Sequence, residues 1–122
     1  MAATVLIVDD AAFMRYMIKG ILTKLGYEVI GEAADGEQAC EMYDILKPDV
    51  VTLDLIMPKK TGLEALRDIR AKHPTARVIV MSAVDQRQPL MEALKLGAAD
   101  YLVKPFEADR VRDSPSRLML NS

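Results

Sequence analysis

The sequence predicts an α/β fold, with five parallel strands in one sheet and helices on both faces. Short runs rich in β-branched residues alternate along the chain with segments of helical period. In three of the five runs nearly every position is apolar, which is typical of strands that helices cover on both sides. Successive strand-and-helix units then favour right-handed crossovers within one sheet. The expected strands are Val5–Val8, Glu28–Ile30, Val50–Leu53, Val78–Met81 and Tyr101–Val103.

The first helix is expected directly after the first strand. Its apolar residues recur at spacings of one, three and four, which predicts a single apolar stripe facing the core. Gly26 is placed to cap the end of this helix. The stripe consists of Phe13, Met14, Met17, Ile18, Ile21, Leu22 and Leu25.

Two later helices are delimited by capping residues and prolines. Thr61 and Glu64 have the spacing of a capping box, before an inner face of Leu63, Leu66 and Ile69. The His73–Pro74 pair closes that helix, because the residue before a proline avoids helical geometry. In the fourth helix, Pro89 is expected in the first turn and Gly97 just past the end.

The tail is the irregular part of the chain. Residues 107–113 begin as a helix, but Pro115 does not fit inside one without cost. We therefore expect one domain over residues 1–122 with an atypical last helix over 107–122. A monomer is expected, with self-association through Leu118–Leu120 as the alternative.

Composition excludes several classes of protein. The 122 residues carry a net charge of −2, which gives no basic footprint for nucleic acid or an anionic membrane. The apolar run Thr4–Val8 stops at Asp9, so neither a leader nor a membrane span is expected. Cys40 is the one cysteine, which forbids an internal disulfide and agrees with a reducing compartment. We expect a soluble cytoplasmic protein with Cys40 inert among apolar neighbours.

Polar residues follow four of the five strands, at the edge where ligands bind in a parallel sheet. They are Asp9 and Asp10, Asp54, Ser82 and Lys104. Three neighbouring carboxylates need a cation, because like charges raise one another's pKa, and oxygen ligands suit Mg²⁺. Together with a lysine and a hydroxyl, such a cation stabilises a phosphoryl group passing to an oxygen nucleophile. Asp54 is the best candidate for that nucleophile.

Each residue alone also has an ordinary structural interpretation. Asp10 has the position of a helix cap, Asp9 that of a solvated loop acid, and Lys104 that of a surface charge. Ser82 alone is most often a loop hydroxyl. The functional hypothesis depends on their conjunction at four strand ends. The only histidine, His73, has no cysteine or histidine partner for a metal site, and Met14 and Met17 are expected to fill the core.

At these residues the sequence resembles the receiver domain of bacterial two-component response regulators, and among them the stand-alone chemotaxis regulators most. The resemblance extends from Val5 to Val111. The matching segments are Val5–Asp10, Asp54–Pro58 with Gly62, Met81–Ala83 and Gly97–Phe106. It implies a flavodoxin-like sheet with strand order 2-1-3-4-5 and a switch that is not an enzyme in the ordinary sense.

The resemblance also implies roles for individual residues. Asp54 would accept the phosphoryl group. Asp10 and Asp54 would bind Mg²⁺ directly, Asp9 mostly through water, and the Ile56 backbone carbonyl would be a further ligand. Ser82 and Lys104 would contact the phosphoryl group, with Tyr101 as the rotamer partner of Ser82. The Lys104–Pro105 peptide would be cis.

The implied partners are proteins. A sensor histidine kinase, of the CheA type if the chemotaxis assignment holds, would phosphorylate Asp54. The face formed by the fourth helix, fifth strand and fifth helix would then bind a target such as a flagellar motor switch protein, and a phosphatase would reset the switch. Two departures from the family pattern are the apolar Ile56 beside the acceptor and the short, proline-containing tail.

Two other functions remain open from the sequence. One is a Mg²⁺-dependent phosphohydrolase with an aspartate nucleophile, of the haloacid-dehalogenase-like kind. Such enzymes carry a second acid two residues after the nucleophile, where this chain has Ile56. The other is an inactive receiver-like binding module. Within the leading hypothesis, a receiver of another two-component pathway is the alternative to the chemotaxis assignment.

Overall fold

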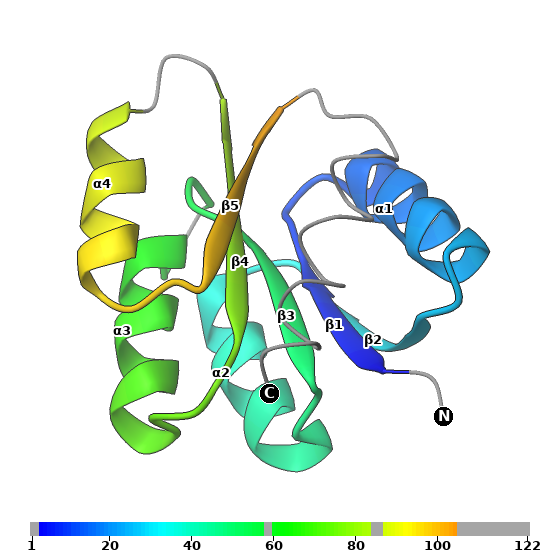
Figure 1. Ribbon diagram of the computed structural model, residues 1–122, viewed down its shortest axis with the longest axis horizontal. Coiled ribbons are helices and arrows are strands. Elements are labelled where there is room, and N and C mark those ends of the chain that lie inside the picture. The colour runs from blue at the N-terminus through cyan, green and yellow to red at the C-terminus, as the bar shows by residue number, and fades with distance from the viewer. Residues whose placement is uncertain (1–2, 58–59, 84–86, 105–122) are drawn as a thin grey trace.

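The computed structural model describes residues 3–57, 60–83 and 87–104, as a parallel sheet between helical layers (Figure 1). The alternation of strand and helix that the sequence predicts is present in all these segments. In chain order the elements are β1 (Thr4–Val8), α1 (Ala12–Lys24), β2 (Glu28–Ala33), α2 (Gly36–Leu46), β3 (Val50–Asp54), α3 (Gly62–Lys72), β4 (Val78–Ala83), α4 (Arg87–Lys95) and β5 (Asp100–Lys104).

All neighbouring strands pair in parallel, in the order β2-β1-β3-β4-β5. The predicted fold class and strand order are therefore confirmed. In Figure 1, α1 lies on one side of the sheet and α2, α3 and α4 on the other. The strand order reverses direction between β1 and β3, so the carboxyl ends of these two central strands lie side by side at one edge.

Strand alternation divides the core into two parts. Val51 and Leu53 of β3 pack with Leu66 and Ile69 of α3, whereas Val50 packs on the α1 side. All five residues of β3 are buried, which agrees with the predicted strand covered on both faces. β3 is thus held by β1 and β4 at its sides and by apolar layers above and below.

The helix boundaries follow the capping signals in the sequence. Gly26 has φ +95° and follows α1, where the amide of Tyr27 donates to the carbonyl of Leu22. Thr61 and Glu64 form the predicted capping box at the start of α3, and His73 ends that helix. Gly97 has φ +99° just past α4, as predicted.

The predicted inner face of α1 is wrong at two positions. Ile18 and Leu22 are buried, but Phe13 is 73% exposed and Met17 is 44% exposed. Successive residues of a helix are about 100° apart around its axis. The seven apolar residues of the predicted stripe therefore cover a wider arc than the part of the helix that faces the sheet. Met17 is therefore a surface residue, while Met14 packs against the core.

Several expectations fall on residues that the structure does not describe. They concern the Lys104–Pro105 peptide and the atypical last helix over 107–122. Within the described ranges, no helix has both the length and the apolar character needed to cross a membrane.

Candidate functional site

Three aspartates lie together at the carboxyl edge of the sheet. Asp9, Asp10 and Asp54 each offer one carboxylate oxygen, and these atoms lie within 4.8 Å of one another. Asp9 is fully buried and Asp54 is 6% exposed, while Asp10 is exposed. The structure thus brings together the three acids that the strand-end pattern points to.

The β1–α1 loop holds Asp9 in place through its backbone and its side chain. The amide of Asp9 donates to the carbonyl of Ala33 in β2 (3.1 Å), and its Oδ1 accepts from the amide of Ala11 (2.9 Å). Ala11 is the N-cap residue of α1 and contributes no side-chain cap. The alternative interpretations of Asp9 as a solvated acid and of Asp10 as the helix cap are therefore wrong.

Asp54 is the last residue of β3, where the strand meets the β3–α3 loop. The amide of Leu55 donates to the carbonyl of Met81 (3.2 Å), and the amide of Ile56 approaches Asp54 Oδ1 (3.4 Å). The first residue of α3 lies next to the end of β3, because the amide of Gly62 donates to the carbonyl of Leu55 (3.0 Å). The start of α3 thereby presses against the backbone that carries Asp54.

Gly62 makes this close approach possible. A Cβ at this position would overlap the carbonyl oxygen of Asp54 and lie 2.6 Å from the Cα of Leu55. Both groups are backbone atoms of the chain at the end of β3, so no side-chain rotation would relieve the overlap. A glycine eight residues after Asp54 is therefore a steric requirement of the site.

The donor set of this cluster suits a hard divalent cation. Two of the three carboxylates are buried, and charged carboxylates in close contact repel one another strongly where water is excluded. All the donors in the cluster are oxygen atoms, and nitrogen or sulfur ligands are absent from it. Mg²⁺ prefers such oxygen ligands and often uses one or two carboxylates together with water and phosphate.

Ser82 lies in the neighbouring strand, one residue beyond Met81, which pairs with Asp54. It is 1% exposed, and its Oγ has no hydrogen-bond partner within the described part of the chain. Strand alternation places it on the α2–α4 side of the sheet with Val80, whereas Asp54 is on the α1 side with Val50. A buried hydroxyl without a partner at the edge of an acidic site is available for a ligand.

Tyr101 shares a sheet face with Ser82. It pairs with Val80, and Ser82 follows Val80 by two residues, so both side chains belong to the α4 side. Tyr101 is 38% exposed and hence directed toward solvent. Lys104 is the last residue of β5, in register with Ala83, but its side chain is outside the described part.

Arg15 is a residue of the site that the strand-end pattern does not predict. Its Nη1 donates to the carbonyl of Asp9 (2.6 Å), and its Nε contacts Glu32 Oε1 (3.1 Å). Arg15 thus ties the acid-bearing loop to β2 from one turn inside α1. A basic residue one turn after an acid pair was the signal available, but it is a common one on helix surfaces.

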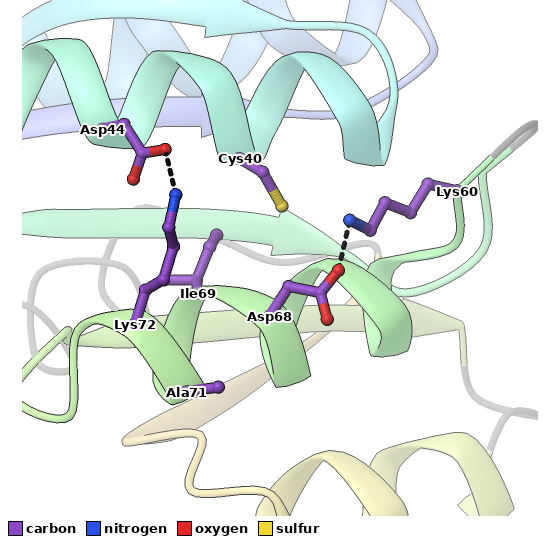
Figure 2. A pocket seen from close by; sticks show the side chains of 7 residues that line it. All are labelled: Cys40, Asp44, Lys60, Asp68, Ile69, Ala71 and Lys72. Atoms are coloured by element: carbon purple, nitrogen blue, oxygen red, sulfur yellow. Dashed lines mark hydrogen bonds and ion pairs between the residues drawn. The ribbon is translucent and has the colours of Figure 1, made fainter.

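A separate concave region lies between α2 and α3 (Figure 2). It has a volume of about 350 Å³, and the thiol of Cys40 faces it between two ion pairs. One pair joins Lys60 to Asp68, and the other joins Lys72 to Asp44 (2.8 Å). The expectation of apolar neighbours around Cys40 is confirmed on the core side, where it packs against the buried apolar cluster, whereas two salt bridges flank its thiol on this side of the helix pair.

The titratable groups of this region hold the two helices together. Burial raises the pKa of the Cys40 thiol, so it remains protonated at neutral pH. Lys72 and His73 hydrogen-bond to Asp44 and lower its pKa, with His73 Nε2 2.8 Å from Asp44 Oδ1. His73 thus links the end of α3 to Asp44 of α2.

Comparison with known proteins gives one consistent family. Residues 5–114 match the model of the response regulator receiver domain. The chain is 50% identical to the chemotaxis protein CheY of Thermotoga maritima, over 97% of this chain and 98% of that protein. It is 48% identical to CheY of Bacillus subtilis, over 98% of this chain and 99% of that protein.

Solved structures agree with these relatives. CheY in the CheX–CheY–BeF₃–Mg²⁺ complex of Borrelia burgdorferi has a TM-score of 0.91 and 36% identity to this chain, covering 96% of this chain and 89% of its own. The NtrX receiver domain of Brucella abortus also has a TM-score of 0.91, with 31% identity, covering 97% of this chain and 99% of its own. The structural similarity therefore extends to a receiver domain that is not named as a CheY.

Proposed function

Because this chain belongs to the response regulator receiver domain family, we propose that it is a phosphorylation-dependent signalling switch with Asp54 as the acceptor. The observation that carries this proposal is the acid cluster at the sheet edge. Asp54 lies there almost fully buried beside Asp9 and Asp10, and the unpartnered hydroxyl of Ser82 is on the adjoining strand. These are the groups that a phosphoryl transfer to a carboxylate requires.

The cation in this proposal is Mg²⁺. Asp10, Asp54 and the backbone carbonyl of Ile56 would hold it directly, and Asp9 would act mostly through water. When bound, Mg²⁺ neutralises charge on the carboxylates and on the phosphoryl oxygens. Its presence in the CheY complex of Borrelia burgdorferi, together with BeF₃, supports the assignment.

The transfer itself is a single exchange of bonds at phosphorus. A carboxylate oxygen of Asp54 attacks the phosphorus of a phosphohistidine or a small acyl phosphate, and the bond to the leaving group breaks as the new one forms. Lys104 would pair with the phosphoryl oxygens, and Ser82 would donate its hydroxyl hydrogen to one of them. No water enters this step, so the product is an aspartyl phosphate.

The switch would run from Ser82 to the surface of α4 and β5. A Ser82 hydroxyl drawn toward the phosphoryl group vacates space on the face that it shares with Tyr101, and the tyrosine ring turns inward to fill that space. The same surface exposes Met91 and Leu94 on α4, which gives a target protein apolar contacts. Phosphorylation thus shifts a two-state equilibrium that changes this surface.

Its partners would be those of a chemotaxis pathway. CheY proteins at about 50% identity over nearly the whole chain favour this pathway over that of other receivers. A histidine kinase of the CheA type would supply phosphate, and a flagellar motor switch protein would bind the activated face. The Borrelia burgdorferi CheY is in a complex with CheX, and by analogy a protein other than the kinase would also bind this chain.

Incubation with acetyl phosphate, followed by intact mass measurement, tests the acceptor role. We expect one phosphate per chain in the presence of Mg²⁺, and no adduct with EDTA or in Asp54→Asn. Asp35→Asn is the matched control, because Asp35 is also a buried aspartate but caps α2 and is not one of the three clustered acids. Release of many phosphates per chain would instead favour the phosphohydrolase, and a wild-type chain without any adduct would favour the binding module.

Ile56→Asn is expected to shorten the lifetime of the aspartyl phosphate by about threefold or more, because an amide two residues from the acceptor orients an attacking water. The Ile56 side chain is 50% exposed and has no group for this task. The measurement is the decay of the phosphorylated fraction after rapid removal of acetyl phosphate. Ile45→Asn is the control, since Ile45 is an exposed isoleucine near the end of α2. Equal lifetimes for wild type and Ile56→Asn would refute this explanation.

A further inference from the structure

In the described part of the chain, Thr52 carries a second buried hydroxyl without a partner. Thr52 is 2% exposed, and its Oγ1 makes no hydrogen bond in the ranges that the structure describes. Ser82 is the other residue with such a hydroxyl, and it is already accounted for by the phosphoryl group. The proposed phosphoryl transfer gives Thr52 no role.

Thr52 lies directly below the acceptor in β3. Strand alternation puts Thr52 and Asp54 on the same side of the sheet, which is the α1 side that Val50 also faces. Residues i and i+2 of a strand are about 6.6 Å apart along its axis. The Thr52 hydroxyl and the Asp54 carboxylate can therefore form a hydrogen bond, either directly or through one bridging water.

Within the described strands, the residues in register with Thr52 offer its hydroxyl no polar side chain. In register with it are Ile7 of β1 and Ile79 of β4, which both belong to the apolar cluster on the α1 side. A hydroxyl buried among such residues has lost its hydrogen bonds to water without replacement, which costs free energy. Valine has almost the same shape and avoids that cost.

One contact that orients the Asp54 carboxylate comes from the loop that follows β3. Its Oδ1 receives the amide of Ile56 at 3.4 Å, which is long for a hydrogen bond of this kind. A second donor from below would restrict rotation of the carboxylate. Restricted rotation matters here, because one oxygen must face the cation while the other faces phosphorus.

We propose that Thr52 is a positioning residue for the acceptor: in the loaded site its hydroxyl hydrogen-bonds the Asp54 carboxylate, directly or through one buried water. This inference rests on the proposed function of Asp54. The bond is charge-assisted, because the acceptor is an ionised carboxylate, and it compensates for the unpaired hydroxyl of the structure described here. The free energy lost by burying the hydroxyl is thus recovered when the cation is bound and the Asp54 carboxylate is held ready for transfer.

The test compares Thr52→Val, which removes only the hydroxyl, with Thr52→Ser, which keeps it. Three quantities are measured on the full chain: the thermal midpoint without Mg²⁺, the Mg²⁺ affinity from the midpoint shift, and the initial rate of phosphorylation by acetyl phosphate. We expect Thr52→Val to have a higher metal-free midpoint, weaker Mg²⁺ binding and a phosphorylation rate lower by about fivefold or more. Thr52→Ser should keep the wild-type rate within about twofold, although it loses a buried methyl group and some stability.

A purely structural role gives the opposite pattern. If Thr52 only fills space, Thr52→Val reacts at the wild-type rate and Thr52→Ser, the less stable variant, is the one impaired. Either of these two results overturns the proposal. A wild-type chain that takes no phosphate, while Thr52→Val still weakens Mg²⁺ binding, would refute the acceptor role of Asp54 and support the positioning of its carboxylate. If the wild type takes no phosphate and Thr52→Val binds Mg²⁺ as the wild type does, both the acceptor role of Asp54 and the positioning role of Thr52 are refuted.

Discussion

Gly62→Ala is expected to lower the free energy of unfolding by about 3 kcal/mol or more. The added Cβ overlaps the carbonyl oxygen of Asp54, and this backbone is fixed by the hydrogen bond from Leu55 to Met81. Relief requires that α3 move away from β3, which breaks the bond from Gly62 to Leu55 and opens the core under Leu66. Urea denaturation followed by far-ultraviolet circular dichroism measures the change.

Gly20→Ala is the matched control for this prediction. Gly20 lies inside α1, and a Cβ there meets no atom within 4 Å. Alanine in a helix interior is favoured over glycine by about 0.5–1 kcal/mol, so this variant should be slightly more stable than the wild type. If Gly62→Ala unfolds at the same urea concentration as Gly20→Ala, the close approach of α3 to Asp54 is not a constraint on the fold.

Asp9→Asn is expected to have opposite effects on the metal-free and metal-bound protein. Without Mg²⁺ the variant should be more stable by about 1 kcal/mol, because a fully buried charge beside Asp54 and Asp10 is removed. Its affinity for Mg²⁺ should fall by about tenfold or more, because a cation partner is lost. The fold around the residue is preserved, since an asparagine oxygen still accepts from the amide of Ala11.

Thermal unfolding across a Mg²⁺ titration separates these two effects. The wild type should gain roughly 2.7 kcal/mol when Mg²⁺ is present at a hundred times its dissociation constant, and Asp9→Asn at the same concentration about half of that or less. Asp35→Asn, which keeps its cap on α2, should respond to Mg²⁺ as the wild type does. A full Mg²⁺ response in Asp9→Asn would remove Asp9 from the cation site.

The convergence of the acids was predictable from the sequence because it depends only on topology. In a parallel sheet every strand ends at the same edge, so residues 45 positions apart in sequence, such as Asp9 and Asp54, meet once their strands are neighbours. The helix ends were predictable for a similar reason, since the signals at Gly26, Thr61 and Gly97 are local.

Other features depend on packing that no local pattern encodes. The exposure of Phe13 and Met17 follows from how far α1 turns relative to the sheet, which the apolar spacing does not determine. Likewise, the N-cap residue of α1 is Ala11 and not Asp10. The amide of Ala11 donates to the side chain of Asp9. The unpaired hydroxyl of Thr52 could be recognised only when Ile7 and Ile79 were seen at its sides.

The burial of β3 has a mechanical consequence for signalling. β3 is hydrogen-bonded to a strand at each edge and is buried on both faces, so it is rigid. A change at Asp54, at its carboxyl end, is therefore expected to displace neighbouring residues and not to deform β3 itself. β5, by contrast, pairs only with β4 among the described strands, and its Tyr101 is open to solvent. We therefore expect β5, at the edge of the sheet, to change conformation more readily than β3 at its centre.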